Sequence, residues 1–230
     1  MPQISPYDKC QYCVDHHAWY CGKRRTLTKT PFPHSSCITL SSCIYYLRLM
    51  KSNSMSVTVS LEDAAHSRCH ILLYSKVENA AEVRQLIMKG QVEASLIKPA
   101  MVVDTFQVIV AANKAVRSLA AKKMVTRSVF AEIIFNLSPT KNITDSLKNF
   151  GLGDGDTEIL AVVLDEESGE KVKKLKSQIR GELTAVTEVL NLTNQARVKQ
   201  LYKVTDSELR VTSLLDAVVS RMACKEFLVM

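Results

Sequence analysis

A sharp change in composition at residue 55 constrains this chain more than any other feature of its sequence. Residues 1–54 contain five of the seven Cys, five of the seven Tyr, four of the six Pro and the single Trp. They also hold seven Lys or Arg against two Asp, a surplus of +5 out of the chain's +7. Residues 55–230 therefore carry only +2, and this segment is long enough to bury a sizeable hydrophobic core. We expect one globular domain over residues 55–230.

Residues 1–54 form a basic, Cys-rich extension, and Met50 and Met55 are both plausible alternative starts. Structural zinc sites join two ligand pairs across a hairpin or helix, and here the second pair is absent. We therefore expect no metal and no cofactor, and an extension that is disordered or specific to one isoform. The extension has neither a secretory signal nor about 20 consecutive apolar residues, so we expect no membrane partner. The residues of the candidate zinc cluster are Cys10, Cys13, His16 and Cys21.

The apolar pattern after residue 55 predicts strands interspersed with helices. Strands are predicted over 57–61, 69–74 and, with the strongest signal, 157–164. Helices are predicted over 79–90, 104–122, 128–137, 142–150 and 172–181, and a terminal helix from Thr205. Residues 92–97 are predicted to add a helical turn, and the ambiguous segment 183–202 includes a possible strand at 201–202. This order predicts an α/β sandwich, a small mixed β-sheet packed with helices, in a single domain with an irregular N-terminal extension.

Sequence motifs of catalysis are missing from the chain. It contains no G-x-S-x-G elbow, no G-K-[ST] phosphate loop and no H-E-x-x-H zinc motif. Gly151, Gly153 and Gly155 follow a predicted helix and precede a predicted strand, which is the reverse of a dinucleotide-binding loop. We expect them to form a helix end and a turn. The chain is therefore predicted not to be an enzyme and to have no small-molecule substrate.

The predicted helix over 104–122 contains two polar residues in an otherwise apolar segment. Burying an amide or an ammonium group without partners costs a few kcal/mol, so Asn113 and Lys114 must find hydrogen bonds or reach a surface. One interpretation is a local cap contact and a lysine that extends to solvent. The other is contact with a ligand or a partner, and the sequence leaves both open.

Five basic residues lie within fourteen positions that include no acid. They could form a strip facing nucleic-acid phosphates, although a solvated basic surface explains any single member equally well. An ion pair between Arg127 and Glu132 is a further alternative. The five residues are Lys114, Arg117, Lys122, Lys123 and Arg127.

The terminal helix carries more apolar residues than a one-sided amphipathic helix needs. We expect part of this surface to pack on the sheet and the excess to fit a partner's groove or a second subunit. The apolar residues are Val211, Leu214, Leu215, Val218, Val219 and Met222.

Four segments of the chain resemble the small α/β subunit family of the EKC/KEOPS complex. They are residues 102–116 (VVDTFQVIVAANKAV), 126–139 (TRS..AEIIFNLSP), 142–151 (NITDSLKNFG) and 213–222 (SLLDAVVSRM). The resemblance extends from Met55 to the end of the chain, and residues 1–54 match nothing in that family.

The resemblance implies a non-enzymatic subunit that binds and stimulates PRPK, the atypical kinase/ATPase of the complex, and through it contacts the other subunits. It also implies support for threonylcarbamoyladenosine modification of tRNAs that read codons beginning with A, possible tRNA contact, and a location in cytoplasm and nucleus. By this resemblance, the expected kinase contacts are Leu215, Val218, Val219 and Met222. The expected tRNA-contact site consists of Lys114, Arg117 and Arg127, with Asn113 and Glu132 shaping it. The alternative function is a stand-alone tRNA- or RNA-binding protein that acts through the basic strip.

Overall fold

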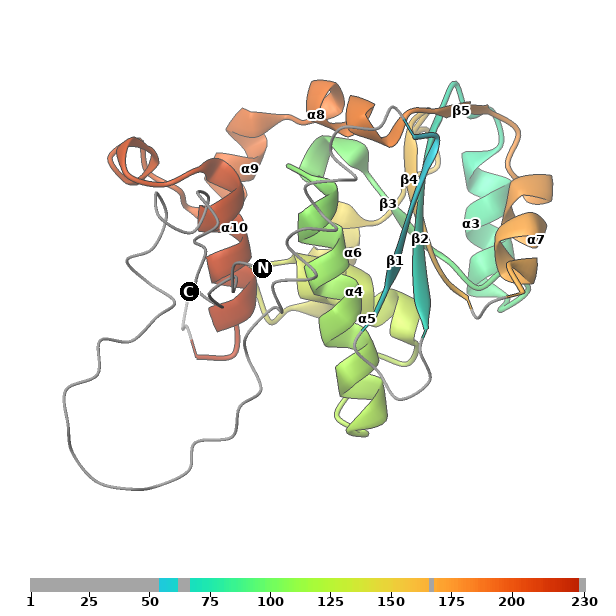
Figure 1. Cartoon of the computed structure of the whole chain (residues 1–230), viewed down its shortest axis with the longest axis horizontal. Coiled ribbons are helices and arrows are strands. Elements are labelled where there is room, and N and C mark those ends of the chain that lie inside the picture. The colour runs from blue at the N-terminus through green and yellow to red at the C-terminus, as the bar shows by residue number, and fades with distance from the viewer. Residues whose placement is uncertain (1–53, 62–66, 166–167, 228–230) are drawn as a thin grey trace, which may run out of the picture. The chain divides into compact units, whose positions relative to one another are not determined.

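The computed structural model describes residues 54–61, 67–165 and 168–227. Five strands and eight α-helices, joined by short 3-10 turns, make up this part of the chain (Figure 1). The strands are β1 (Ser56–Ser60), β2 (Arg68–Ser75), β3 (Ser95–Ile97), β4 (Ile159–Asp165) and β5 (Glu182–Thr184). The helices are α3 (Ala80–Met88), α4 (Thr105–Ala120), α5 (Val129–Leu137), α6 (Ile143–Phe150), α7 (Glu170–Gln178), α8 (Val189–Leu192), α9 (Gln195–Tyr202) and α10 (Leu214–Cys224). The 3-10 turns are η1 (Pro99–Met101), η2 (Val186–Glu188) and η3 (Glu208–Arg210).

The five strands form one sheet in the order β1-β2-β4-β3, and β5 pairs with β2 beyond the end of β1. The predicted α/β class is confirmed, but every pairing in the described residues is antiparallel, where a mixed sheet was expected. The physical reason is that an antiparallel strand lies between each two strands that share a direction. β2 and β3 run in the same direction, yet β4 lies between them and pairs antiparallel with both. β2 in turn lies between β4 and β5, which also share a direction.

The two crossover helices lie on the same face of the sheet. α3 leads from β2 across β4 to β3, and α7 leads from β4 across β2 to β5. The second crossover moves across the sheet in the opposite direction to the first, and its starting strand β4 runs antiparallel to β2. These two reversals cancel, so two crossovers of the same handedness place their helices on the same face of the sheet. Figure 1 shows α3 and α7 side by side on that face, while α4, α5 and α6 lie on the other.

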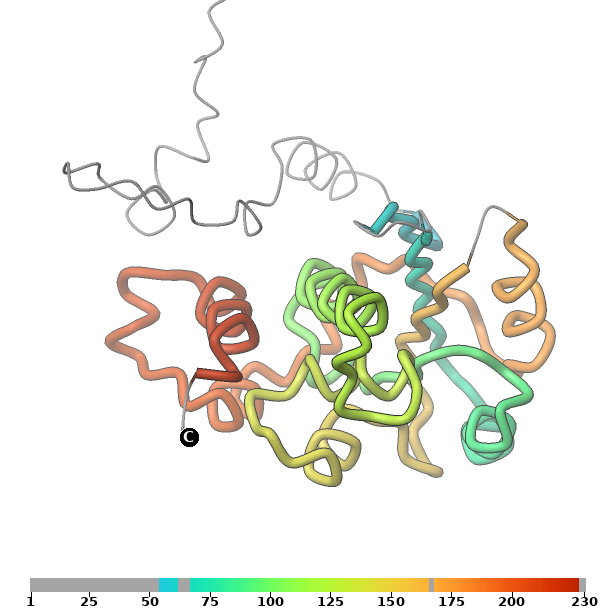
Figure 2. The backbone as a smooth tube through the Cα atoms, turned by 90° about the horizontal axis from the view of Figure 1, so that it is seen from below, coloured from blue at the N-terminus to red at the C-terminus, as the bar shows by residue number. Residues whose placement is uncertain are grey.

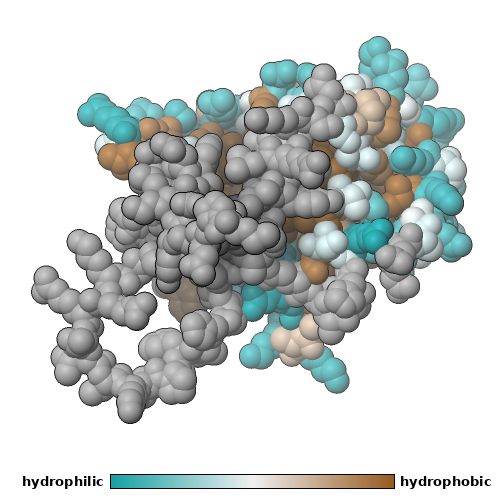
Figure 3. Space-filling model, in the orientation of Figure 1, coloured by the Kyte–Doolittle hydropathy of each residue, from teal (hydrophilic) through white to brown (hydrophobic). Residues whose placement is uncertain are grey.

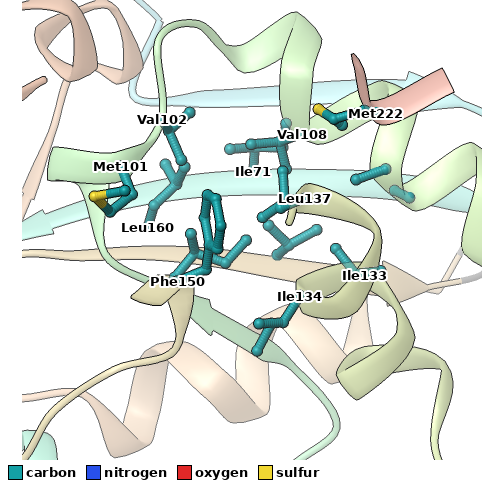
Figure 4. Close-up of a cluster of buried hydrophobic side chains, with 14 of the residues drawn as sticks. Ile71, Met101, Val102, Val108, Ile133, Ile134, Leu137, Phe150, Leu160 and Met222 are labelled. Atoms are coloured by element: carbon teal, nitrogen blue, oxygen red, sulfur yellow. The ribbon is translucent and has the colours of Figure 1, made fainter. Parts of the chain in front are cut away.

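Alternation along β2 divides the core into two layers. Cys69, Ile71 and Leu73 face the larger cluster, which includes residues of α4, α5 and α10. Leu72 and Tyr74 face the smaller cluster under α3 and α7. Figure 4 shows side chains of the larger cluster pointing toward one another from the sheet and helices, with Met222 of α10 near Val108 of α4.

Helix α4 lies between the sheet and α10. It contacts β2 on one side and α10 on another, and Figure 2 shows the sheet, α4 and α10 as successive layers. Alanines at its close contacts are fully buried, namely Ala111, Ala112 and Ala115. Small side chains let neighbouring elements approach a helix closely, so α4 can be enclosed on several sides. The terminal helix was expected to pack on the sheet, and it reaches the core through α4 instead.

Most predicted elements are confirmed, and the exceptions have identifiable causes. Residues 95–97 form β3, where a helical turn was expected, because Gly90 (φ +70°) terminates α3 and the next residues pair with β4. Residues 201–202 belong to α9, whereas the strand of that region is β5. Thr205 precedes only the 3-10 turn η3, and the terminal helix begins at Leu214 after its own cap, Ser213.

The N-terminal boundary predicted at residues 54–55 stays a prediction, because residues 1–53 lie outside the described part. Asn79 does begin α3, although its side chain makes no capping bond. Its amide instead joins the end of α7 to α3, donating to the carbonyl of Gln178 at 2.8 Å and accepting from the N–H of Arg180 at 2.9 Å.

Tyr202 connects three helices inside the larger cluster. Its fully buried hydroxyl donates to the carbonyl of Leu137 at the end of α5 and accepts from the side-chain amide of Gln107 in α4, at 3.0 Å. Gln107 in turn accepts the N–H of Val103 at 2.9 Å. The ring packs edge-to-face on Phe150. One side chain thus joins α4, α5 and α9.

We predict that Tyr202→Phe lowers the free energy of unfolding by about 1–3 kcal/mol, since it strands a buried carbonyl and a buried amide. Tyr74→Phe is the matched control, because the Tyr74 hydroxyl is buried without a hydrogen-bond partner. Its removal should cost nothing or stabilise the protein. Urea denaturation of both variants checks this. Equal losses in the two variants would contradict the assigned role of Tyr202.

Candidate functional site

The inner side of α10 attaches the helix to the rest of the domain. The helix begins at Ser213, whose hydroxyl accepts the N–H of Asp216 at 3.1 Å. Val218 and Met222 are 0% and 2% exposed and belong to the larger core cluster. Both were expected to contact the kinase. In this structure their side chains pack inside the domain, so they are unavailable as partner anchors while α10 stays docked.

Leu214 is partly buried against the same core cluster, which leaves Leu215 and Val219 on the helix and Val211 just before it. We call Val211, Leu215 and Val219 the exposed apolar strip: Val211 is 84% exposed, and the other two are partly exposed. Leu215 and Val219 are one turn apart and therefore share a side of α10. Figure 3 shows hydrophobic surface at the left, where the turn leading into α10 lies in Figure 1. Of the expected kinase contacts, Leu215 and Val219 therefore remain available.

A bidentate salt bridge fixes the segment that carries Val211. Arg221 of α10 donates to both carboxylate oxygens of Glu208 in η3, at 2.7 and 2.8 Å, and also to the carbonyl of Lys203. The bond from Arg221 holds the pKa of Glu208 below its usual range, and the same bond raises the pKa of Arg221. A planar bidentate pair restricts the relative orientation of the two side chains. The turn is therefore held against α10 and the exposed apolar strip is preformed.

Glu132 organises the loop between α4 and α5. Glu132 is 2% exposed, and its carboxylate accepts the N–H groups of Val125 and Thr126 and the hydroxyl of Thr126, at 2.6 to 3.2 Å. These bonds, and not the alternative ion pair with Arg127, account for its burial. Glu132 was expected to shape the tRNA-contact site. Its bonds to residues 125–126 fix the loop that presents Arg127.

Asn113 and Lys114, in the middle of α4, differ in their surroundings. The side-chain oxygen of Asn113 is buried without a hydrogen-bond partner. The ammonium of Lys114 pairs at 3.0 Å with the carboxylate of Glu226, just beyond α10. The structure thus links the middle of α4 to the end of the terminal helix.

The other basic residues lie toward the end of α4 and in the loop that follows. Arg117, Lys122, Lys123 and Arg127 are exposed. Leu119 and Val125, 47% and 57% exposed, lie in the same stretch of chain. An exposed cationic surface suits a phosphate backbone. Of the expected tRNA contacts, Arg117 and Arg127 therefore lie at the surface, whereas Lys114 is engaged by Glu226.

The sequence did not identify Lys225 as a buried, interacting residue. It lies 2% exposed between α10 and α5, donates to the carbonyl of Phe135, and places its ammonium 3.2 Å from the centre of the Phe135 ring. Burial, and secondarily the charge of Lys114, lower its pKa from 10.5 to about 7. No local pattern marks Lys225, since it follows the last apolar repeat of the terminal helix.

The candidate zinc cluster, Cys10, Cys13, His16 and Cys21, lies outside the described residues. Within the described residues, no group of three or more His, Cys, Asp or Glu side chains could hold a metal ion. The helices described there are also too short or too polar to cross a membrane.

Comparison with known proteins gives a consistent result. A family profile described as "Kinase binding protein CGI-121" matches residues 74–226. The chain is 44% identical over 156 residues to the EKC/KEOPS complex subunit TPRKB of Danio rerio, which covers 67% of this chain and 89% of that protein. It is 29% identical over 119 residues to the EKC/KEOPS complex subunit CGI121 of Kluyveromyces lactis, covering 52% and 74%. For the cgi121 subunit of Aspergillus fumigatus, the identity is 36% over 95 residues, covering 40% and 50%.

The lowered pKa of Lys225 predicts a pH-dependent stability. Between pH 7 and about 10 the unfolded chain binds a proton at this lysine that the folded chain has largely lost, so the free energy of unfolding should rise with pH over that window. Below about pH 7 the contribution is constant. We predict that wild type gains stability from pH 7 to 9.5 relative to Lys225→Met, measured by urea denaturation at each pH. A difference between the two proteins that does not change with pH would contradict this.

Proposed function

The chain belongs to the CGI-121 family of kinase-binding proteins, and from this membership we propose that it is a non-catalytic, kinase-binding subunit of an EKC/KEOPS complex. The observation that carries the proposal is the extent of the family match. Residues 74–226 include α3 to α10 and the strands β3, β4 and β5, together with the last two residues of β2. The matched range also covers residues 208–222 of this chain, which include Glu208 and Arg221 and the buried Val218 and Met222.

The partner we propose is the PRPK-type kinase of the complex, bound through Val211, Leu215 and Val219. Leu215 and Val219 lie on the docked helix α10, and the bond between Glu208 and Arg221 holds the turn that carries Val211. Preformed apolar surface lowers the entropic cost of association. The proposal includes stimulation of the kinase, support for threonylcarbamoyl modification of tRNA, and residence in cytoplasm and nucleus with the complex.

A second proposed contact is with tRNA, through the basic strip. It is supported by exposed Arg117, Lys122, Lys123 and Arg127 and by the loop that Glu132 fixes. Because residues 55–230 carry only +2 in total, the strip alone would bind RNA weakly. Contact with RNA within the assembled complex is therefore favoured over a stand-alone RNA-binding function.

We predict that Val211→Glu combined with Leu215→Glu abolishes a one-to-one complex with the kinase subunit while thermal stability changes little. Size-exclusion chromatography of the mixed full-length proteins checks this. Met88→Glu is the matched control: Met88 is 76% exposed and lies on α3, across the sheet, so binding should survive. Retained binding in the double variant, or its loss in Met88→Glu, would contradict the proposed surface.

Val218→Glu separates core from contact. A carboxylate at this fully buried position should unfold the domain or displace α10, because an unpaired buried charge costs several kcal/mol. Circular dichroism and thermal melting measure the loss. A well-folded Val218→Glu protein that fails to bind the kinase would show that the residue is a contact after all.

For RNA, we predict that Arg117→Gln combined with Arg127→Gln weakens binding of a tRNA transcript and reduces the slope of log K against log salt by roughly 1.5. The matched control is Lys173→Gln combined with Lys174→Gln, two exposed lysines of α7 on the other face of the sheet. Filter binding over a salt series gives both quantities. Identical slopes in the two double variants would exclude the basic strip as the RNA contact.

A further inference from the structure

Three lysines from separate parts of the chain converge on the turn that follows α10. Lys114 of α4 forms an ion pair with the carboxylate of Glu226 at 3.0 Å. Lys141, just before α6, donates to the main-chain carbonyl of Glu226 at 3.1 Å. Lys225 is the adjacent residue, and it lies close enough to Lys114 for that charge to lower its pKa. Two cationic side chains, Lys114 and Lys141, therefore contact a single residue, Glu226, whose own side chain is exposed.

The other acid near this cluster is already engaged. Glu132 interacts electrostatically with Lys225, but its carboxylate accepts two N–H groups and a hydroxyl from residues 125–126. It is 2% exposed. Glu132 therefore cannot turn toward Lys114, and Glu226 is the acid that neutralises that lysine from the solvent side.

The two partners of the ion pair are held very differently. The side chain of Lys114 is 27% exposed and extends from the middle of a helix enclosed on several sides. The side chain of Glu226 is 68% exposed and extends from a turn beyond the end of α10. The cation is therefore fixed, and the acid can leave with little cost to the fold. A phosphate oxygen accepts from an ammonium at the same distance as a carboxylate oxygen.

We propose that Lys114 is a phosphate-binding position for RNA that the carboxylate of Glu226 fills in the free subunit. RNA must displace Glu226 to reach it, so this residue is an internal competitor that restrains binding by the subunit alone. The inference rests on the RNA contact proposed above and adds to it a defined phosphate position and a restraint. Surface ion pairs are weak, so the restraint should be modest, about two- to five-fold in affinity.

The test compares Glu226→Gln with Glu182→Gln in the full chain. Glu182 is a close match, since it pairs with Lys76 at 3.0 Å and its side chain is 63% exposed on β5. Each variant raises the net charge by one unit. We expect Glu226→Gln to bind a tRNA transcript about two- to five-fold more tightly than Glu182→Gln at equal salt, with a slope of log K against log salt steeper by roughly 0.7–0.9.

A second pair of variants locates the effect. In a Lys114→Gln background, Glu226→Gln should bring no gain beyond that of Glu182→Gln, because the phosphate position has lost its cation. Thermal melting confirms that each variant is folded. A gain that persists without Lys114, or equal affinities for the two Glu variants, would overturn the proposed competition while leaving RNA binding itself intact. If wild type and all variants fail to bind the transcript, the RNA contact fails as well, and the two failures are thereby distinguished.

Discussion

The burial of α4 on several sides is the constraint on which the larger core cluster and the position of α10 depend. The sheet, α5 and α10 all pack against it. They can do so because the small side chains of Ala111, Ala112 and Ala115 let neighbouring elements approach the helix closely. Two polar side chains of the enclosed helix find partners inside the domain, although the side-chain oxygen of Asn113 does not. The Gln107 side chain accepts the N–H of Val103 and donates to the hydroxyl of Tyr202, and the ammonium of Lys114 pairs with the carboxylate of Glu226. A single helix thus sets the position of the terminal helix and of the first residue of the basic strip.

The terminal helix is fixed by polar contacts to two other segments. Arg221 reaches back to Glu208 in the turn that precedes the helix. Just beyond the end of the helix, Lys225 reaches the carbonyl and ring of Phe135 in α5. Val218 and Met222 supply the hydrophobic attachment to the core. With its inner side committed in this way, α10 can offer only its outer side to a partner, which is why the exposed apolar strip is narrow.

The sequence predicted the fold class because its strongest signals are local. The apolar run of β4 and the periodic patterns that begin at residues 104, 128 and 142 each specify an element within a few residues, and the structure confirms these elements. β3 and β5 were not predicted, because three-residue strands exist only through their pairing with β4 and β2. The direction of pairing is likewise a property of the whole sheet.

The candidate site was harder to predict for a related reason. Periodicity showed that α10 has a wide apolar surface but could not tell its inner side from its outer one, so core and surface residues were grouped together. Leu215 and Val219 remain available, whereas Val218 and Met222 do not. Glu132 and Lys225 owe their roles to contacts between distant segments, and only the folded chain brings those together. The basic strip was visible in the sequence, but the ion pair that engages Lys114 was not.

The central claim is that α10 is docked by its inner side and binds the kinase by its outer side. Hydrogen–deuterium exchange of the full chain, alone and with the kinase subunit, tests it most directly. The account predicts that the kinase slows exchange over residues 208–223 and leaves α3 and α7 unchanged. Protection confined to α3 and α7, or none over residues 208–223 in a stable complex, would contradict it.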